Sequence, residues 1–170
     1  MCDRAMIRRT INRVFSVLLL ILANTAAANL VVVGPCNVDN SQRLALLIGA
    51  EEYALLGENK LRGPLHDVDL VANGLLARGF SATILTGQRA TRSEVEATWR
   101  ALPEKTRCGD HVVLMLSGNT FSDASAKRWR FLFEDAQKND RGTDVDSGQW
   151  SDDLLLDRIR KLRADGVHVT

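Results

Sequence analysis

An apolar run that ends at Ser117-Gly118-Asn119 is the feature that most constrains how this chain folds. The run extends from Val112 to Leu116 and contains no polar side chain. Strands of parallel sheets are covered on both faces and therefore consist of continuous apolar residues. Open α/β folds place their chemistry at the carboxyl ends of such strands. The run therefore predicts a buried parallel strand that presents Ser117 and Asn119 at the functional edge of a sheet.

Strands and helices alternate over most of the chain. Apolar runs predict strands, and apolar side chains at helical spacing predict helices. Thr91 and Glu94 form a capping-box pattern at one helix start, and Ser151 marks another. The predicted strands span residues 43–49, 80–85 and 110–116, and the predicted helices span residues 64–79, 91–103 and 151–166. This alternation implies parallel βαβ units, so we expect an α/β fold with a mainly parallel central sheet.

The pattern is weaker between residues 120 and 149. Residues 130–133 predict a short strand, whereas residues 135–148 are rich in Asp, Asn and Gly and predict a loop. A fourth parallel strand starts at Val167, and the sequence stops at Thr170. Because a parallel sheet without its next strand would expose apolar surface, we expect either a fragment of a longer chain or a chain that pairs with a partner strand.

The N-terminus has the composition of a secretory signal peptide. Arginines precede the apolar residues 14–23, and Ala26-Ala27-Ala28 offers small residues for cleavage. Residues 14–33 are also about long enough to span a bilayer, so an uncleaved membrane anchor is the alternative. We expect residues 1–28 to be the signal, residues 29–42 a linker and residues 43–170 the folded domain. Both interpretations place the domain outside the cytosol, either secreted or periplasmic, or anchored to the membrane.

Charge and cysteine content narrow the classes of function. The formal net charge is +1 and no basic stretch follows the N-terminus, which argues against nucleic acid as a partner. Cys2 would leave with the signal, and Cys36 and Cys108 would remain in a compartment that permits disulfides. The sequence leaves their pairing open and favours two unpaired thiols. Neither cysteine lies in a setting that suggests a nucleophile, since Cys108 precedes a turn and has only Arg107 and Lys105 as local cationic neighbours.

Six segments in a fixed order resemble the large-subunit half of caspase-like cysteine peptidases, above all metacaspases and bacterial caspase-family proteins. They are residues 43–49 (RLALLIG), 61–67 (LRGPLHD), 76–80 (LARGF), 109–118 (GDHVVLMLSG), 131–135 (FLFED) and 150–153 (WSDD). The resemblance covers residues 43–170. It implies a three-layer α/β/α fold, here truncated after the start of the fourth strand, and descent from cysteine endopeptidases with a preference for basic residues.

The catalytic dyad that the resemblance implies is absent from these residues. In the family a histidine follows Ser-Gly at the end of the third strand, and a cysteine follows an Asp near the end of the fourth. Here Asn119 stands at the histidine position, and the sequence stops before the cysteine. An amide does not titrate near neutral pH and cannot replace imidazole as a base. The histidines elsewhere, His66, His111 and His168, are expected to be surface or structural residues.

Two residues that the resemblance implies for substrate binding are present. Asp67 matches the Asp that binds a basic residue in metacaspases, and Ser117 matches a serine of the same pocket. A carboxylate there would pair with Lys or Arg through charge-assisted hydrogen bonds. The alternative is that Asp67 only complements the helix dipole at the start of a helix. The sequence favours neither interpretation over the other. Pro64 stands where metacaspases often carry a cysteine, so the pocket wall differs.

The resemblance suggests calcium as a candidate cofactor. Some metacaspases bind it through acids in this half of the domain, and Asp135, Asp152 and Asp153 fall near those positions. Three more Asp residues between positions 140 and 146 could add oxygen ligands. The sequence favours the alternative, a solvated acidic loop and a helix cap, because no EF-hand spacing is present.

Three hypotheses about function follow from the sequence. The chain is a caspase-like peptidase domain that is inactive as it stands, a non-catalytic module that binds partners, or a fragment without a function of its own. In the first two cases the expected partner is a peptide or protein that presents Lys or Arg.

Overall fold

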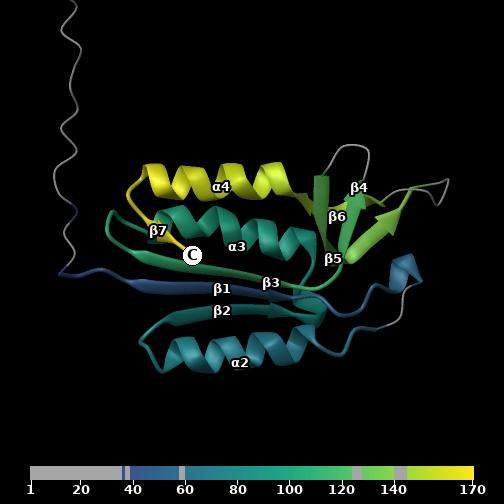
Figure 1. Cartoon of the computed structure of the whole chain (residues 1–170), viewed down its shortest axis with the longest axis horizontal. Coiled ribbons are helices and arrows are strands. Elements are labelled where there is room, and N and C mark those ends of the chain that lie inside the picture. The colour runs from purple at the N-terminus through teal and green to yellow at the C-terminus, as the bar shows by residue number, and fades with distance from the viewer. Residues whose placement is uncertain (1–35, 37–38, 58–59, 124–127, 140–144) are drawn as a thin grey trace, which may run out of the picture. The chain divides into compact units, whose positions relative to one another are not determined.

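The computed structural model describes residues 36, 39–57, 60–123, 128–139 and 145–170. They form one unit that begins at Cys36 and contains two sheets (Figure 1). The first sheet has the strand order β2-β1-β3-β7, with β1 at Arg43–Gly49, β2 at Ser81–Thr86, β3 at His111–Ser117 and β7 at His168–Val169. The second has the order β4-β5-β6, with β4 at Thr120–Asp123, β5 at Arg128–Lys138 and β6 at Val145–Ser151.

The first sheet is parallel throughout, as the alternating pattern predicts. β1 pairs with β2 on one side and with β3 on the other, and β3 pairs with β7. The central strand β1 is the most deeply buried, and Leu47 and Ile48 are fully enclosed. The register aligns Gly49 with Ser117, so the carboxyl ends of β1 and β3 lie side by side.

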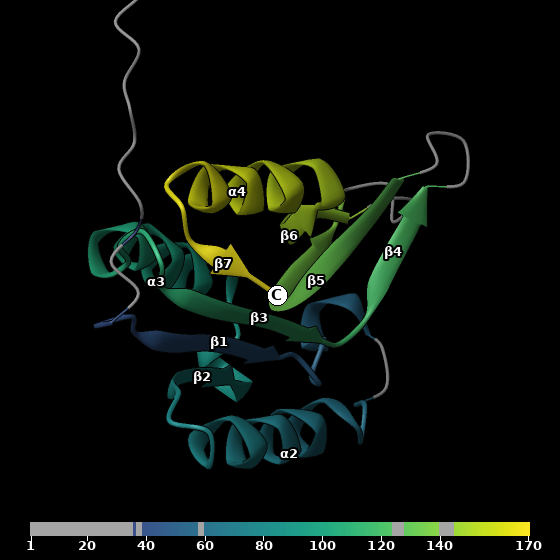
Figure 2. The same cartoon turned by 60° about the vertical axis from the view of Figure 1, so that its left-hand side comes forward.

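Three long helices cover the two faces of this sheet and complete a three-layer α/β/α arrangement (Figures 1 and 2). The helix α2 (Pro64–Leu76) packs on one face, where Val68 and Ala72 meet Ala45 and Leu47. The helices α3 (Arg92–Lys105) and α4 (Asp152–Ala164) lie on the opposite face. Short 3-10 helices at Ala54–Leu56 (η2) and Gly87–Arg89 (η3) complete the unit. This is the expected fold class, with a mainly parallel central sheet.

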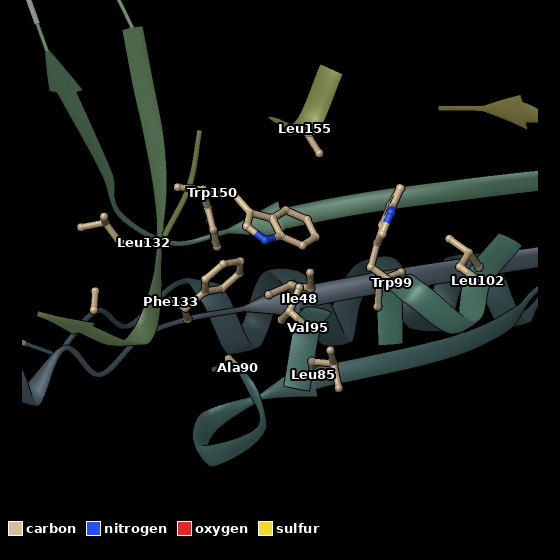
Figure 3. Packing of buried hydrophobic residues seen from close by; sticks show 14 of the residues in the cluster. Ile48, Leu85, Ala90, Val95, Trp99, Leu102, Leu132, Phe133, Trp150 and Leu155 are labelled. Atoms are coloured by element: carbon tan, nitrogen blue, oxygen red, sulfur yellow. The ribbon is translucent and has the colours of Figure 1, made fainter. Parts of the chain in front are cut away.

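The larger hydrophobic core lies between the parallel sheet, α3, α4 and the second sheet. Trp150 of β6 is fully buried between Phe133 and Trp99, which meet it edge to face at centroid distances of 5.4 and 5.9 Å (Figure 3). Edge-to-face contacts of this kind add to the free energy of area burial. Ile48 of β1 lies below Trp150 in this view. The aromatic residues of the second sheet therefore share one core with the central strand β1.

The helix caps follow the sequence. The Thr91 hydroxyl accepts a hydrogen bond from the Glu94 N–H, and the Ser151 hydroxyl accepts one from the Leu154 N–H. Pro103, expected to end its helix, instead lies in the last turn of α3, which continues to Lys105. The helix therefore extends only two residues beyond the expected end. Proline has no N–H to donate to the helical hydrogen bonds, which agrees with a helix end close to it.

The second sheet corrects the expectation of a loop over residues 135–148. β5 runs through Phe131, Leu132 and Phe133, which are all buried, and continues to Lys138. β6 pairs with it antiparallel, with register shifts between Leu132 and Lys138. Gly148 lies at this irregularity with φ 68°, and a Cβ there would come within contact of the Ala136 backbone. The glycine marks a β-bulge and not a loop, which periodicity alone does not distinguish.

A disulfide joins Cys36 to Cys108 and corrects the expectation of two unpaired thiols. The two cysteines are 72 residues apart in sequence. Beside them, the buried Asp110 carboxylate accepts hydrogen bonds from the backbone N–H groups of Gln42 and Arg107. The start of β1 and the loop before β3 are therefore held together covalently and by a buried carboxylate. The spacing of the cysteines in the sequence does not predict the disulfide, because the two residues approach each other only when β1 pairs with β3.

Of the expectations for the N-terminus, the signal or anchor over residues 1–28 lies outside the described residues. Within the described ranges, no helix is both long and apolar enough to cross a membrane.

Candidate functional site

The carboxyl edge of the parallel sheet brings Asp67 and Ser117 together. Asp67 lies in the first turn of α2, and Ser117 is the last residue of β3. The Ser117 hydroxyl donates a hydrogen bond to Asp67 Oδ2 at 2.8 Å. The resemblance placed both residues at one pocket, and the structure brings their side chains into contact. The Asp67 carboxylate is exposed, and no cationic side chain of the described residues pairs with it.

Gly49 is the reason that α2 approaches this edge so closely. A Cβ at Gly49 would lie 3.0 Å from the Pro64 carbonyl oxygen and 3.0 Å from Val68 Cγ2. Pro64 occupies the first turn of α2, where its fixed φ and missing N–H are tolerated. The small residue at the end of β1 therefore allows the helix N-terminus, and Asp67 with it, to reach Ser117.

Asn119 follows immediately in the loop between β3 and β4, and it is half-buried. Its backbone N–H donates to the Tyr53 hydroxyl at 2.7 Å, and its carbonyl accepts a hydrogen bond from the Leu132 N–H at 3.0 Å. Asn119 thus lies two residues after Ser117, with both backbone polar groups satisfied. Its correspondence to the family's histidine stays a prediction from the resemblance.

Tyr53 is a residue of the site that the sequence did not indicate. Its side chain is 1% exposed, and its hydroxyl donates to the Ala50 carbonyl at 2.9 Å while accepting from Asn119. Burial raises the pKa of the Tyr53 phenol, the hydrogen bond from Asn119 lowers it, and the Glu134 carboxylate raises it further, with a net upward shift. The phenol is therefore neutral at physiological pH and can donate and accept at once.

Glu134 of β5 is a second residue that the sequence did not indicate. Its Oε1 accepts hydrogen bonds from the backbone N–H groups of Glu51 and Glu52, at 2.9 and 3.2 Å. The loop after β1 is thereby attached to the second sheet. An acid directly after the apolar residues of this strand is the signal that could have indicated Glu134. Its partners could not be predicted, because they lie more than 80 residues away.

The acids considered for calcium have other partners. Asp135 Oδ1 accepts the Arg92 N–H at 2.9 Å, while Asp152 and Asp153 both form ion pairs with Arg128. Among the described residues, no three His, Cys, Asp or Glu side chains come close enough to hold a metal ion. The side chains of the Asp residues between positions 140 and 146 lie outside the described part. Calcium binding stays a prediction that these contacts do not test.

Two of the three histidines lie at the opposite end of the sheet from Asn119. His111 and His168 start β3 and β7 at the opposite end of the sheet, where their rings stack at 4.9 Å. His66 is exposed in the first turn of α2, one residue before Asp67. Both cysteines that the structure describes are joined in the disulfide.

Comparison with known proteins agrees with this architecture. A family model of the caspase domain matches residues 42–141. The crystal structure of a protein from Geobacter sulfurreducens superimposes with a TM-score of 0.53 and 26% sequence identity, covering 75% of this chain and 48% of that protein. This chain thus spans about half the length of that protein. No curated protein matches the chain significantly.

The family match covers more than half of the chain and includes β1, α2, β3 and the edge at which Asp67 contacts Ser117. The parallel sheet and its three covering helices fit the same assignment. The chain belongs to the caspase domain family of cysteine peptidases.

Proposed function

We propose that this domain is a catalytically inactive member of the family that binds Lys or Arg side chains of peptides at its sheet edge. The observation that carries the proposal is the Asp67–Ser117 contact of 2.8 Å at the carboxyl end of β3. Asp67 is exposed there and has no cationic partner in the described part of the chain. A carboxylate oriented by a hydroxyl donor and open to solvent is suited to a charge-assisted hydrogen bond with a guanidinium or ammonium group.

The absence of catalysis is part of the proposal. Peptide hydrolysis by this family needs a thiolate and an imidazole that moves protons. Asn119 cannot move a proton near neutral pH, and Cys36 and Cys108 are not free thiols. A fluorogenic peptide with Arg or Lys before the scissile bond should therefore not be hydrolysed by the purified chain. Turnover that a thiol-blocking reagent abolishes would contradict this part of the proposal.

Binding is tested by calorimetry with a short Arg-containing peptide. The matched ligand carries citrulline in place of arginine, which removes the charge and keeps the shape. Asp67→Asn should weaken binding of the Arg peptide by roughly twofold to fivefold, since an exposed charge pair contributes modestly. Asp69→Asn, an exposed acid on the same helix, is the control and should leave the affinity unchanged. Equal binding of both peptides, or an equal loss in both variants, would refute the role of Asp67.

We also propose that the domain functions in an oxidising compartment, outside the cytosol. The Cys36–Cys108 disulfide supports this, because structural disulfides persist in secreted and periplasmic proteins and are rare in the cytosol. Mass spectrometry of the protein from its native source, after alkylation without a reductant, tests the proposal. Alkylated Cys36 and Cys108 would contradict it.

A further inference from the structure

Burial of the Tyr53 hydroxyl costs free energy unless hydrogen bonds replace those that it would make with water. Tyr53 is the single tyrosine of the chain and is 1% exposed within the larger core. A phenyl ring would fill the same space without the cost of removing a hydroxyl from water. Here the hydroxyl has one donor and one acceptor partner, and both are backbone atoms. Its contacts are therefore specific to backbone position and not to any neighbouring side chain.

The two partners belong to the two segments that form the candidate site. Ala50 follows the last residue of β1, and Asn119 follows Ser117 and Gly118 at the end of β3. The Ala50 N–H in turn donates to the Ser117 carbonyl at 2.9 Å. The hydroxyl thus closes a ring of three hydrogen bonds: Asn119 N–H to Tyr53, Tyr53 to the Ala50 carbonyl, and Ala50 N–H to Ser117.

Gly118 makes this ring sterically possible. A Cβ at Gly118 would lie 2.7 Å from the Tyr53 hydroxyl and 2.9 Å from the Ala50 carbonyl oxygen. Tyr53 itself is fixed from the other side, because Glu134 of β5 binds the N–H groups of the two residues before it. The phenol is therefore held by the second sheet and in turn holds the loop that carries Asn119.

We propose that the Tyr53 hydroxyl is a positioning group that fixes the backbone of residue 119 and, through it, the geometry of the Asp67–Ser117 edge. The effect on ligand binding rests on the proposed function, whereas the fixing of residue 119 does not. Tyr53 touches no ligand in this scheme and acts through the loop. Without its oxygen, the Asn119 N–H and the Ala50 carbonyl lose their partner and the loop becomes free to move.

Tyr53→Phe tests the proposal with two measurements. Amide hydrogen exchange, followed by NMR, should accelerate at Asn119 by about tenfold or more, because local opening no longer breaks a hydrogen bond. Exchange at Leu46 and Leu114, in the centres of β1 and β3, should not change. Affinity for the Arg peptide should fall by about threefold or more. Thr106→Val, which removes a hydroxyl bonded to the Pro103 carbonyl outside the site, is the matched control and should change neither readout.

The outcomes separate the two proposals. Unchanged exchange at Asn119 in a folded Tyr53→Phe protein would overturn the positioning role, and so would faster exchange with unchanged peptide affinity. If the wild-type protein binds no Arg peptide, the proposed function fails, and exchange at Asn119 alone decides whether Tyr53 fixes the loop. If the variant does not fold, the wild type provides the test. Saturation with the Arg peptide should shift the ring resonances of this single tyrosine, and their invariance would contradict the proposal.

Discussion

The fold shifts the pKa values of Tyr53 and Glu96 in opposite directions, upward for Tyr53 and downward for Glu96. Tyr53 holds the loop of the candidate site, as described above. Glu96 of α3 lies at the junction of α3, α4 and β6, where its carboxylate accepts hydrogen bonds from Trp150 Nε1 at 2.8 Å and from Arg158 Nη2 at 2.6 Å. The Arg158 guanidinium also lies over the Trp150 ring, at 4.2 Å from its centroid. The protonation of each group should therefore affect the free energy of unfolding through these contacts.

The Tyr53 phenol predicts a loss of stability at alkaline pH. Its pKa is raised above 10.0 in the folded state, chiefly by burial. Below 10.0 the phenol is protonated in both states, so its contribution is fully present. As pH rises from 10.0 through the folded-state pKa, only the unfolded state loses the proton, and the free energy of unfolding falls. Urea unfolding across this range should show a smaller fall in Tyr53→Phe than in wild type. Equal curves would contradict the assignment.

Glu96 predicts the reverse dependence at acid pH. Burial alone would raise the pKa of Glu96, but the hydrogen bonds from Arg158 and Trp150 outweigh it and the net pKa is lowered from 4.5. The stabilisation is therefore present above 4.5 and is lost as pH falls through the folded-state pKa. Glu96→Gln should unfold more easily at neutral pH, by about 1–3 kcal/mol, and the difference should shrink in acid. Glu94→Gln, in the exposed first turn, is the control.

At the residue scale, the sequence indicates Asp67, Ser117 and Asn119 as candidate site residues. It does not indicate the residues whose hydrogen bonds fix the neighbouring loops. The first three belong to segments whose order resembles a known family. Tyr53 and Glu134 act through backbone atoms of loops that are distant in sequence, and such partners exist only once the two sheets are in place. The disulfide was missed for the same reason, since Cys36 and Cys108 meet only when β1 pairs with β3.

At the scale of elements, β1, α2, α3, β3 and α4 follow from the sequence to within a few residues. Their apolar patterns are strong, and the three helices start with a cap or a proline. Only residues 130–133 of β5 follow from the sequence, and β6 does not, because the pairing of the two strands is irregular and their Asp, Asn and Gly residues are typical of loops. The burial of Trp150 and the pairing of β5 with β6 become clear only in the structure.

The contact between β1 and α2 predicts the effect of Gly49→Ala. The added methyl group meets the Pro64 carbonyl and Val68, so α2 must shift. We expect a loss of about 1–3 kcal/mol in the free energy of unfolding, typical of overpacking, together with weaker binding of the Arg peptide. Gly74→Ala, inside α2, meets only the Arg78 side chain at 3.6 Å and should be neutral or stabilise the protein by up to about 1 kcal/mol. Equal effects of both substitutions in chemical unfolding would contradict this packing argument.

At the scale of the whole molecule, a parallel sheet, its helices and a smaller antiparallel sheet form one unit with the candidate site at one end. The disulfide and Asp110 secure the opposite end, near the starts of β1 and β3 (Figure 1). The candidate site and the disulfide thus lie at opposite ends of the strands. This division predicts that restraints at the amino ends can be removed without changing the site itself.

Removal of the disulfide tests this separation. The double variant Cys36→Ser and Cys108→Ser should lose about 2–4 kcal/mol of unfolding free energy, as is typical when a long loop is no longer closed. Affinity for the Arg peptide should be unchanged under conditions where the variant is folded. Wild-type protein treated with a reductant should behave like the variant in thermal unfolding. A loss of affinity in the folded variant would show that the two ends are coupled.

NMR mapping with isotope-labelled protein and the Arg peptide directly tests whether peptides bind at the carboxyl edge of the sheet. Resonances of Asp67, Ser117 and Asn119 should shift on titration, while those of His111 and His168 at the opposite end of the sheet stay unchanged. The citrulline peptide should produce smaller shifts at the same residues. Shifts confined to the opposite end, or none at saturating peptide, would contradict the assignment of this edge as the binding site.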